Sequence, residues 1–270
     1  MRYLEFSPPP GFDLLVSRLV FMENSGTLNF RTVPRNYPAV IITAPDSGAW
    51  QIEIGHSRHQ LHNGNVYFAG LGFTPSKMSF NGKLKIWVAI LKPQAAQIIF
   101  GDNAGAFVNE ISCVSDIHAP LRLLSEQLWE NRENRNNPEN SVQLIERYFV
   151  RFLERQNIKP AILRALDKIH TTKGKVSVRE LADAAFTCNR HLLRQFIGQV
   201  GVNPKKYSAM VRFSKLMNEW MLNPASDVGN LAFDYGFYDL SHLNKEAVRF
   251  LGVPLHEIKE QNNSLNQNLV

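Results

Sequence analysis

The sequence predicts an α+β protein in which a β-rich sandwich or barrel is followed by an all-α region with two helix-turn-helix modules. Three observations predict this arrangement. Short strand-like runs separated by turn signals fill the first 115 residues, and apolar residues recur at helical spacing after residue 119. A short helix, a tight turn and a second helix then occur twice between Val176 and Lys259, which is the helix-turn-helix pattern.

The β-rich part is predicted from its alternation of apolar runs and turn residues. The expected strands cover residues 14–21, 39–42, 50–54, 66–69, 78–80 and 84–91. Many short strands at this spacing are typical of a sandwich or barrel. The Asn-Gly dipeptides at 63–64 and 81–82 have the composition that tight hairpin turns require, so we expect a hairpin at each.

Two groups of residues in this part could carry chemistry. The histidines His56, His59 and His62 are close in sequence, but strand alternation puts only the first and last on one face. We therefore predict surface or turn histidines, with no catalytic residue, cofactor or metal site. A second group consists of large aromatic residues that line either a ligand cavity or, as is more common, a packed core. These are Trp50, Phe68, Phe73, Phe80 and Trp87.

The middle of the chain changes to helical periodicity. Helices are expected over 119–132 and 142–156, with a polar loop at 131–140 between them. Lys159-Pro160 marks a boundary, because proline starts helices and restricts the residue before it, and a further helix follows over 162–170. The apolar stripe of 119–132 has two equally good explanations, a dimer contact or packing against the β-rich part.

The first helix-turn-helix copy has an apolar face from Val178 to Ala185. The segment 187–189 interrupts it and offers side-chain oxygens that can cap a second helix. That second helix repeats apolar residues at helical spacing and ends at Gly201, a helix C-cap signal. The repeated residues are Leu192, Leu193, Phe196 and Ile197.

The second copy begins at Asp227 and turns at Gly236-Phe237. Asp239 can cap its second helix, which ends at Gly252. Between the copies a long helix is expected over 204–222, with Asn203 as its N-cap and Pro204 in its first turn. About eighteen residues span about 27 Å, comparable with the ~34 Å between successive major grooves on one side of DNA.

Residues 176–259 resemble the DNA-binding domain of AraC/XylS-type transcription regulators. The matching residues are Glu180-Leu181-Ala182, Leu192, Arg194, Phe196, Gly201-Val202-Asn203-Pro204, Tyr207, Arg212, Leu231-Ala232, Gly236-Phe237, Ser241 and Gly252-Val253. Three positions depart from the family pattern: Ala247 replaces a usual phenylalanine, Glu219 lies in a usually apolar stretch, and Pro254 comes one residue early. Beside such a domain, the β-rich part resembles the cupin-like sensor domain of many family members.

The resemblance implies which residues face DNA. Arg190 and Arg194 match base-contacting positions, and their four-residue spacing puts them on one helix face. Ser241 and Lys245 match groove-facing positions of the second module. The exposed face of that helix should also hold His242 and Asn244, because apolar residues take its buried side. The full predicted set is Asn189, Arg190, Leu193, Arg194, Ser241, His242, Asn244 and Lys245. For each arginine the alternative is a phosphate contact or a solvated helix face.

The composition limits the classes of protein to which the chain can belong. The chain has 270 residues, a net charge of +6 and two cysteines, Cys113 and Cys188. The positive charge permits nucleic-acid binding without proving it. Two distant cysteines exclude a disulfide framework and favour a reducing cytoplasm. We find no secretory signal and no apolar run of membrane-spanning length. The expected domains are a sensor at 1–115, a helical linker at 116–159, a DNA-binding domain at 160–262 and a disordered tail at 263–270.

These predictions lead to a sequence-specific transcription regulator, an activator by preference, controlled by its N-terminal domain. Its expected partners are double-stranded promoter DNA, RNA polymerase, a small-molecule or protein effector, and a second copy of itself in a homodimer. A cupin-type metal-dependent enzyme with a helical accessory domain is the alternative, although the usual His-x-His and glutamate pattern of such enzymes is absent. A third alternative treats the C-terminal helices as a protein-interaction bundle.

Overall fold

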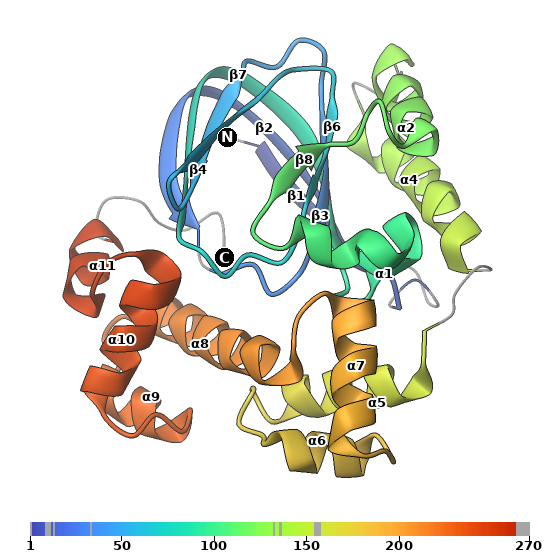
Figure 1. Cartoon of the computed structure of the whole chain (residues 1–270). Coiled ribbons are helices and arrows are strands. Elements are labelled where there is room, and N and C mark those ends of the chain that lie inside the picture. Colours follow the sequence, from blue (N-terminus) through green and yellow to red (C-terminus); the bar gives the residue numbers. More distant parts are fainter. Residues whose placement is uncertain are drawn as a thin grey trace.

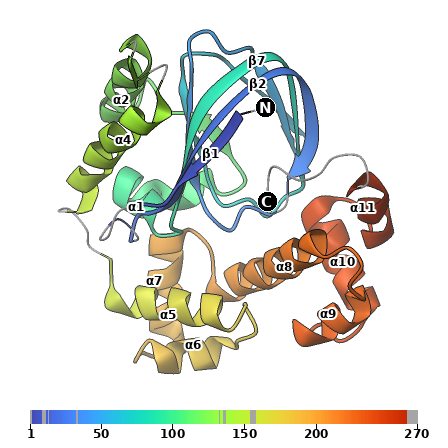
Figure 2. The same ribbon diagram turned by 180° about the vertical axis from the view of Figure 1, so that it is seen from behind.

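A computed structural model describes residues 2–8, 12, 14–32, 34–131, 133–134, 137–153 and 158–262. A curved antiparallel sheet forms one body, and the C-terminal helices form a second body beneath it (Figure 1). The reverse view shows the same two bodies, with helix α8 running under the sheet (Figure 2). The predicted order, β-rich first and all-α second, is confirmed. The expected tail at 263–270 lies outside the described residues.

Two long paired strands form the largest part of the sheet. Strand β2 (Val16–Thr32) pairs with β7 (Ser76–Leu91) along their whole lengths, and β1 (Arg2–Phe6) adds to the outer edge of β2. The prediction of a hairpin turn at Asn81-Gly82 is wrong, because both residues lie inside β7. Gly82 faces Gly26 across the ladder, and both have positive φ angles. Two opposed glycines let the paired strands bend sharply without ending.

The remaining strands complete the sheet. β3 (Ala39–Thr43) pairs with β7 and with β6 (Val66–Ala69), which pairs with β8 (Ile111–Cys113). β4 (Trp50–Ile54) pairs with β7 and with β5 (Ser57–Leu61). Asn63-Gly64 does turn the chain, but it joins β5 to β6, and those two strands are not paired. The turn-punctuated sequence pattern predicts no strand at β1, β5 or β8.

Alternation along the strands supplies two apolar faces. In β3, Val40 and Ile42 belong to one core cluster and Ile41 to another. The five aromatic residues considered for a ligand cavity are all buried and are divided among three clusters. Trp50 and Phe80 pack edge to face, with ring centroids 5.9 Å apart. These aromatics are therefore core residues.

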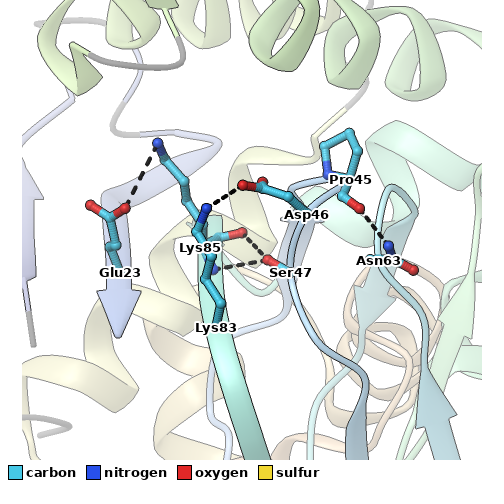
Figure 3. A network of polar contacts seen from close by, with 7 residues as sticks. All are labelled: Glu23, Pro45, Asp46, Ser47, Asn63, Lys83 and Lys85. Carbon is cyan, nitrogen blue, oxygen red and sulfur yellow. Dashed lines mark hydrogen bonds and ion pairs between the residues drawn. The ribbon is translucent and has the colours of Figure 1, made fainter. Parts of the chain in front are cut away.

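The β3–β4 loop is tied to β7 by polar contacts (Figure 3). The Ser47 hydroxyl donates to the Lys85 backbone oxygen at 2.8 Å and accepts from the Lys85 amide at 2.9 Å. Lys83 pairs with Asp46, while the Lys85 ammonium lies 3.9 Å from a Glu23 carboxylate oxygen. The same loop accepts a bond from the Asn63 side chain at Pro45. Side-chain bonds thus add to the backbone bonds that Ala44 and Gly48 donate to Lys85 and Lys83 of β7.

Helices α1 (Ala95–Phe100) and η1 (Gly101–Phe107) lie between β7 and β8 in the chain, and α2 (Ala119–Glu130) and α4 (Pro138–Leu153) follow β8. Four apolar residues of α2 are buried in the same cluster as one sheet face and α4, whereas Leu123 is exposed. The four buried residues are Leu121, Leu124, Leu128 and Trp129. Packing within the chain therefore accounts for the α2 stripe, and a homodimer stays a prediction.

The C-terminal body contains seven helices within the described residues. They are α5 (Pro160–Thr171), α6 (Val178–Ala184), α7 (Asn189–Val200), α8 (Pro204–Leu222), α9 (Val228–Asp234), α10 (Leu240–Leu251) and α11 (Leu255–Asn262). One apolar cluster runs through α5 to α11 and also takes in Leu71 and Phe73 of the N-terminal part. The two parts of the chain therefore share core contacts.

Candidate nucleic-acid interface

Each helix-turn-helix module is fixed by local capping. The α6 N-cap Ser177 accepts from the Glu180 amide at 3.2 Å, and the Glu180 carboxylate accepts from the Ser177 amide at 2.7 Å, which is a capping box. The second helix of the second module, α10, begins at the predicted cap, because Asp239 accepts from the His242 amide at 2.7 Å. Helices α7 and α10 both end at glycines in the left-handed conformation, Gly201 and Gly252.

Helix α7 differs from expectation at its start. Its N-cap is Cys188, and no side chain caps it, so the predicted capping oxygens of 187–189 are not used. The chain instead turns at Phe186, which has a positive φ of 53° and an exposed ring. The Arg164 guanidinium lies over that ring, 5.1 Å from its centroid. The contact between Arg164 of α5 and the Phe186 ring therefore stabilises the turn before α7, where no side chain caps the helix.

Helix α8 joins the modules as one rigid segment. Its N-cap is Asn203, which accepts from the Lys206 amide at 2.7 Å, with Pro204 in the first turn, as predicted. Its 19 residues span about 28 Å at 1.5 Å per residue. Most of its length is buried between the two modules.

Two residues that depart from the family pattern, Glu219 and Ala247, make contacts within the C-terminal helices. Glu219 accepts from the Tyr235 hydroxyl at 2.5 Å and lies 3.5 Å from the Lys173 ammonium. The hydrogen bond from Tyr235 holds the pKa of the Glu219 carboxyl below its usual range, with Lys173 adding to the effect. Glu219 thereby connects the α5–α6 loop to the end of α9. The Ala247 methyl is buried in the same apolar cluster as Phe213 and Phe250, whose ring centroids lie 5.0 Å apart.

The α7 face expected to read DNA is exposed. Asn189, Arg190, Leu193 and Arg194 all present accessible side chains, while Leu192 and Phe196 are buried on the opposite side. The Arg194 guanidinium contacts the His191 ring at 3.0 Å, and Gln195 contacts the other nitrogen of that ring. His191 therefore restricts where the Arg194 fork points. Its contact could be inferred from the three-residue spacing on the helix.

On α10 the four predicted residues divide into two pairs. Ser241 and Lys245 are exposed, in agreement with their four-residue spacing. His242 and Asn244 are half-buried and bonded within the chain. The Asn244 side-chain oxygen accepts from the Leu255 amide at 2.9 Å, and His242 packs edge to face on Phe237 at 5.3 Å. The sequence placed all four on the open face, but α11 and the turn cover one side of it.

The histidines of the N-terminal part are separated. His56 lies in the β4–β5 turn, His59 in β5 and His62 after it, and only His59 is half-buried. Among the described residues, no three His, Cys, Asp or Glu side chains are grouped closely enough to hold a metal ion.

Polar contacts cross from the β-rich part to helices α5 and α8. The buried Tyr207 hydroxyl of α8 lies 3.1 Å from the backbone oxygen of Asn36, to which it donates. It also lies 3.0 Å from His170 Nε2, and because a phenol has one hydrogen, it accepts from that nitrogen. The His170 ring stacks on Tyr37 with centroids 5.6 Å apart. We call Asn36, Tyr37, His170 and Tyr207 the junction.

Further contacts extend the junction along α8. The Ser214 hydroxyl donates to the Pro34 backbone oxygen at 3.2 Å, and the Lys206 ammonium lies 4.3 Å from the Phe73 ring centroid. Burial, with Lys215 and Lys92 nearby, lowers the pKa of His170 to about 4. The imidazole is therefore neutral at physiological pH, and its neutral form carries the hydrogen on Nε2.

Comparison with solved structures identifies the fold. ToxT from Vibrio cholerae O395 aligns with 91% of this chain and 99% of its own, with 13% identity and a TM-score of 0.50. The chain has the ToxT fold. An unsaturated fatty acid bound ToxT from Vibrio cholerae strain SCE256 aligns with 99% of this chain and 100% of its own, at 10% identity and a TM-score of 0.48. A cupin superfamily protein from Desulfitobacterium hafniense aligns with 34% of this chain and 78% of its own, at 10% identity and a TM-score of 0.27.

ToxT is an AraC-family regulator with a cupin-like domain before its helix-turn-helix domain. The architecture predicted from the resemblance is therefore confirmed at the level of the fold. No family model and no curated protein matches the sequence. In the described part of the chain, no helix combines the length and apolar character needed to cross a membrane. The domain boundaries and the site residues stay predictions.

Proposed function

We propose that the protein is a DNA-binding transcription regulator whose helices α7 and α10 read adjacent major grooves. The observation that carries this is a repeated exposed strip at equal positions of the two helices. Arg190 and Arg194 of α7 correspond to Ser241 and Lys245 of α10, counted from the first helical residue. All four are exposed. Helix α8 joins the two modules as one rigid segment, and its length of about 28 Å is comparable with the ~34 Å between successive major grooves.

The chemistry of the strips suits base reading and phosphate contact. An arginine fork pairs with guanine O6 and N7, which contributes about 1–3 kcal/mol of discrimination. Lys245 supplies a compact charge and reads guanine less strictly than arginine. Asn189, in the first turn of α7, is also exposed and completes the reading edge. We therefore expect α7 to dominate sequence discrimination.

We also propose that the N-terminal part controls the reading helices through the junction. Tyr207 and Ser214 lie on α8, the helix that both modules share, and each bonds to the loop at residues 34–37. A small-molecule or protein effector that shifts this loop would change how α8 is held. A fatty acid is bound in one ToxT structure, which supports a small-molecule effector as a class. The activator role and RNA polymerase as partner stay predictions.

Selection from a randomised duplex pool by the full chain tests this proposal. We expect enrichment of a sequence with two half-sites about one helical turn apart, and an affinity that falls steeply with salt as counterions are released. Arg194→Ala should relax preference at defined base pairs, which distinguishes base reading from a phosphate contact. Arg122→Ala on α2 is the matched control, because Arg122 is exposed but pairs with Glu126 outside the C-terminal helices. Undetectable binding at low salt by folded protein would contradict the proposal.

A further inference from the structure

Branched aliphatic side chains stand among the basic residues of the reading strips. On α7, Leu193 is 41% exposed and Ile197 is 46% exposed. Together with Arg190 and Arg194 they occupy positions i, i+3, i+4 and i+7, which is one continuous helix face. The sequence pattern grouped both aliphatic residues with the apolar side of the helix. The core side is instead filled by Leu192, Phe196 and Val200.

Helix α10 repeats the feature at the equivalent place. Val248 is the ninth residue of α10, as Ile197 is of α7, and it is 47% exposed. Each lies three residues after the basic residue of its strip, Arg194 or Lys245. Exposing a large aliphatic group forgoes the favourable transfer from water that burial provides. Its recurrence at the same position of both reading helices points to an apolar partner outside the chain.

We propose that Leu193 and Ile197 of α7, and Val248 of α10, contact the 5-methyl groups of thymines in the major groove. This proposal rests on the proposed function. The thymine methyl is the apolar group that base edges present in that groove, and aliphatic side chains bind it. The flanking arginines attract the phosphate backbone and bring this face to the duplex. The strip therefore reads thymine beside the base pairs that Arg190 and Arg194 contact.

Helix geometry sets how many thymines α7 can reach. Leu193 and Ile197 are four residues apart, which is about 6 Å along the axis. Base pairs are about 3.4 Å apart, so the two side chains span about two base-pair steps. A thymine at one or two positions of the first half-site is expected, with one more in the second half-site under Val248.

Deoxyuridine provides the test, because it differs from thymidine only by the missing methyl and keeps the same hydrogen-bonding groups. The full chain is used with the duplex it selects from the randomised pool, and each thymine is replaced singly by uracil. We expect affinity to fall about three- to fivefold at one or two positions of the first half-site and at one position of the second, as the loss of one buried methyl implies. The other replacements should change it by less than about 1.5-fold.

Protein variants assign each methyl to its side chain. Leu193→Ala and Ile197→Ala should each abolish the uracil effect at one position, so that thymine and uracil duplexes bind equally there. Leu123→Ala on α2, whose side chain is 51% exposed, is the matched control and should keep every uracil effect. All three substitutions are at exposed positions, and thermal unfolding checks that the variants remain folded.

The outcomes separate this proposal from the proposed function. No binding to any duplex would refute DNA binding itself. Tight, sequence-selective binding that ignores every uracil replacement would overturn methyl reading and leave DNA binding intact. Uracil effects that persist unchanged in both α7 variants would also overturn it, because other groups would then contact the methyls.

Discussion

The Tyr207 hydroxyl of α8 donates to the backbone oxygen of Asn36 at 3.1 Å, so a hydrogen bond from the helix that joins the two modules enters the β-rich part. Tyr207 is completely buried, and the same oxygen accepts from His170 Nε2 at 3.0 Å. One phenol therefore satisfies a donor from α5 and an acceptor from the β2–β3 loop. Because the two hydrogen bonds share the Tyr207 hydroxyl, each one strengthens the other.

Tyr207→Phe should destabilise the full chain by about 1–2 kcal/mol, because two buried polar groups lose their partner. Urea denaturation of both proteins measures the difference. Tyr238→Phe is the control, since the Tyr238 side chain is 91% exposed and its loss of hydroxyl should change stability by less than about 0.5 kcal/mol. Equal stability of Tyr207→Phe and the parent protein would show that the junction bond contributes nothing.

Acid should weaken the fold through His170. Its folded-state pKa of about 4 lies below the ordinary value near 6.5, so the unfolded chain takes up a proton first as pH falls. Stability should therefore fall between about pH 6.5 and 4, by at most on the order of 3 kcal/mol, and His170 should add no further loss below that window. Protonation places a third positive charge beside Lys215 and Lys92, against the Tyr37 ring and the Tyr207 hydroxyl.

His170→Gln removes this titration and should flatten the dependence of unfolding free energy on pH between pH 6.5 and 5. The control is His56→Gln, because His56 is exposed in a turn. Parallel curves for His170→Gln and the parent protein would rule out His170 as the source of acid sensitivity.

Gly174→Ala should destabilise the protein by more than about 2 kcal/mol. Gly174 has a φ of +76°, and an added Cβ would overlap the Ser208 backbone oxygen and lie 2.7 Å from the Arg212 nitrogen. Gly198→Ala gives the opposite sign, because Gly198 is in α7 and its Cβ would meet no described atom within 4 Å. A gain of about 0.5–1 kcal/mol is expected there. Thermal unfolding of both variants measures the contrast, and a neutral Gly174→Ala would refute the packing argument.

Glu219→Gln should lower stability at neutral pH by a few tenths of a kcal/mol, since the carboxylate is about two-fifths exposed and its ion pair is screened. Because the folded-state pKa of Glu219 is depressed, its contribution is present above the usual carboxyl range and is lost as pH falls through the folded value. The two proteins should therefore converge in acid. A difference that grows as pH falls would reverse the assigned sign.

Arg194→Ala should cost more sequence discrimination than Lys245→Ala across a library of operator variants. Arg194 offers a two-pronged donor held by His191, whereas Lys245 offers one charge, and its neighbours His242 and Asn244 are bonded within the chain. Parallel binding measurements on the two variants give the ranking directly. Greater loss of discrimination from Lys245→Ala would show that α10 is the main reader.

Local signals predicted the helical part well and the sheet less well. Gly201 and Gly252 end α7 and α10, because a left-handed cap is a short-range requirement. Asn203 and Asp239 cap the N-termini of α8 and α10 for the same reason. Asn81-Gly82 has the composition of a hairpin turn, yet it lies within β7. Pairing with Gly26, more than fifty residues away, decides its conformation, and a local pattern does not contain that information.

The residues expected to face DNA also depend on contacts that local sequence patterns do not contain. Helical spacing correctly placed Arg190, Arg194, Ser241 and Lys245 on exposed surfaces. It could not show that α11 begins against Asn244, because that contact depends on where the chain returns after Gly252. Nor could the spacing reveal Tyr207 and Asn36 as partners, since 171 residues separate them.

Under the proposed function, helix α8 also limits how the promoters of this protein can change. It is buried along most of its length and bonded to the β-rich part at Tyr207 and Ser214, so neither module can shift along the duplex independently of the other. Five inserted base pairs between half-sites would turn the second one to the far side of the duplex, about half a helical turn away. Ten would restore the side but increase the distance between the half-sites from about 34 Å to about 68 Å, more than twice the ~28 Å length of α8. Base substitutions can therefore tune such promoters, whereas small insertions and deletions abolish recognition.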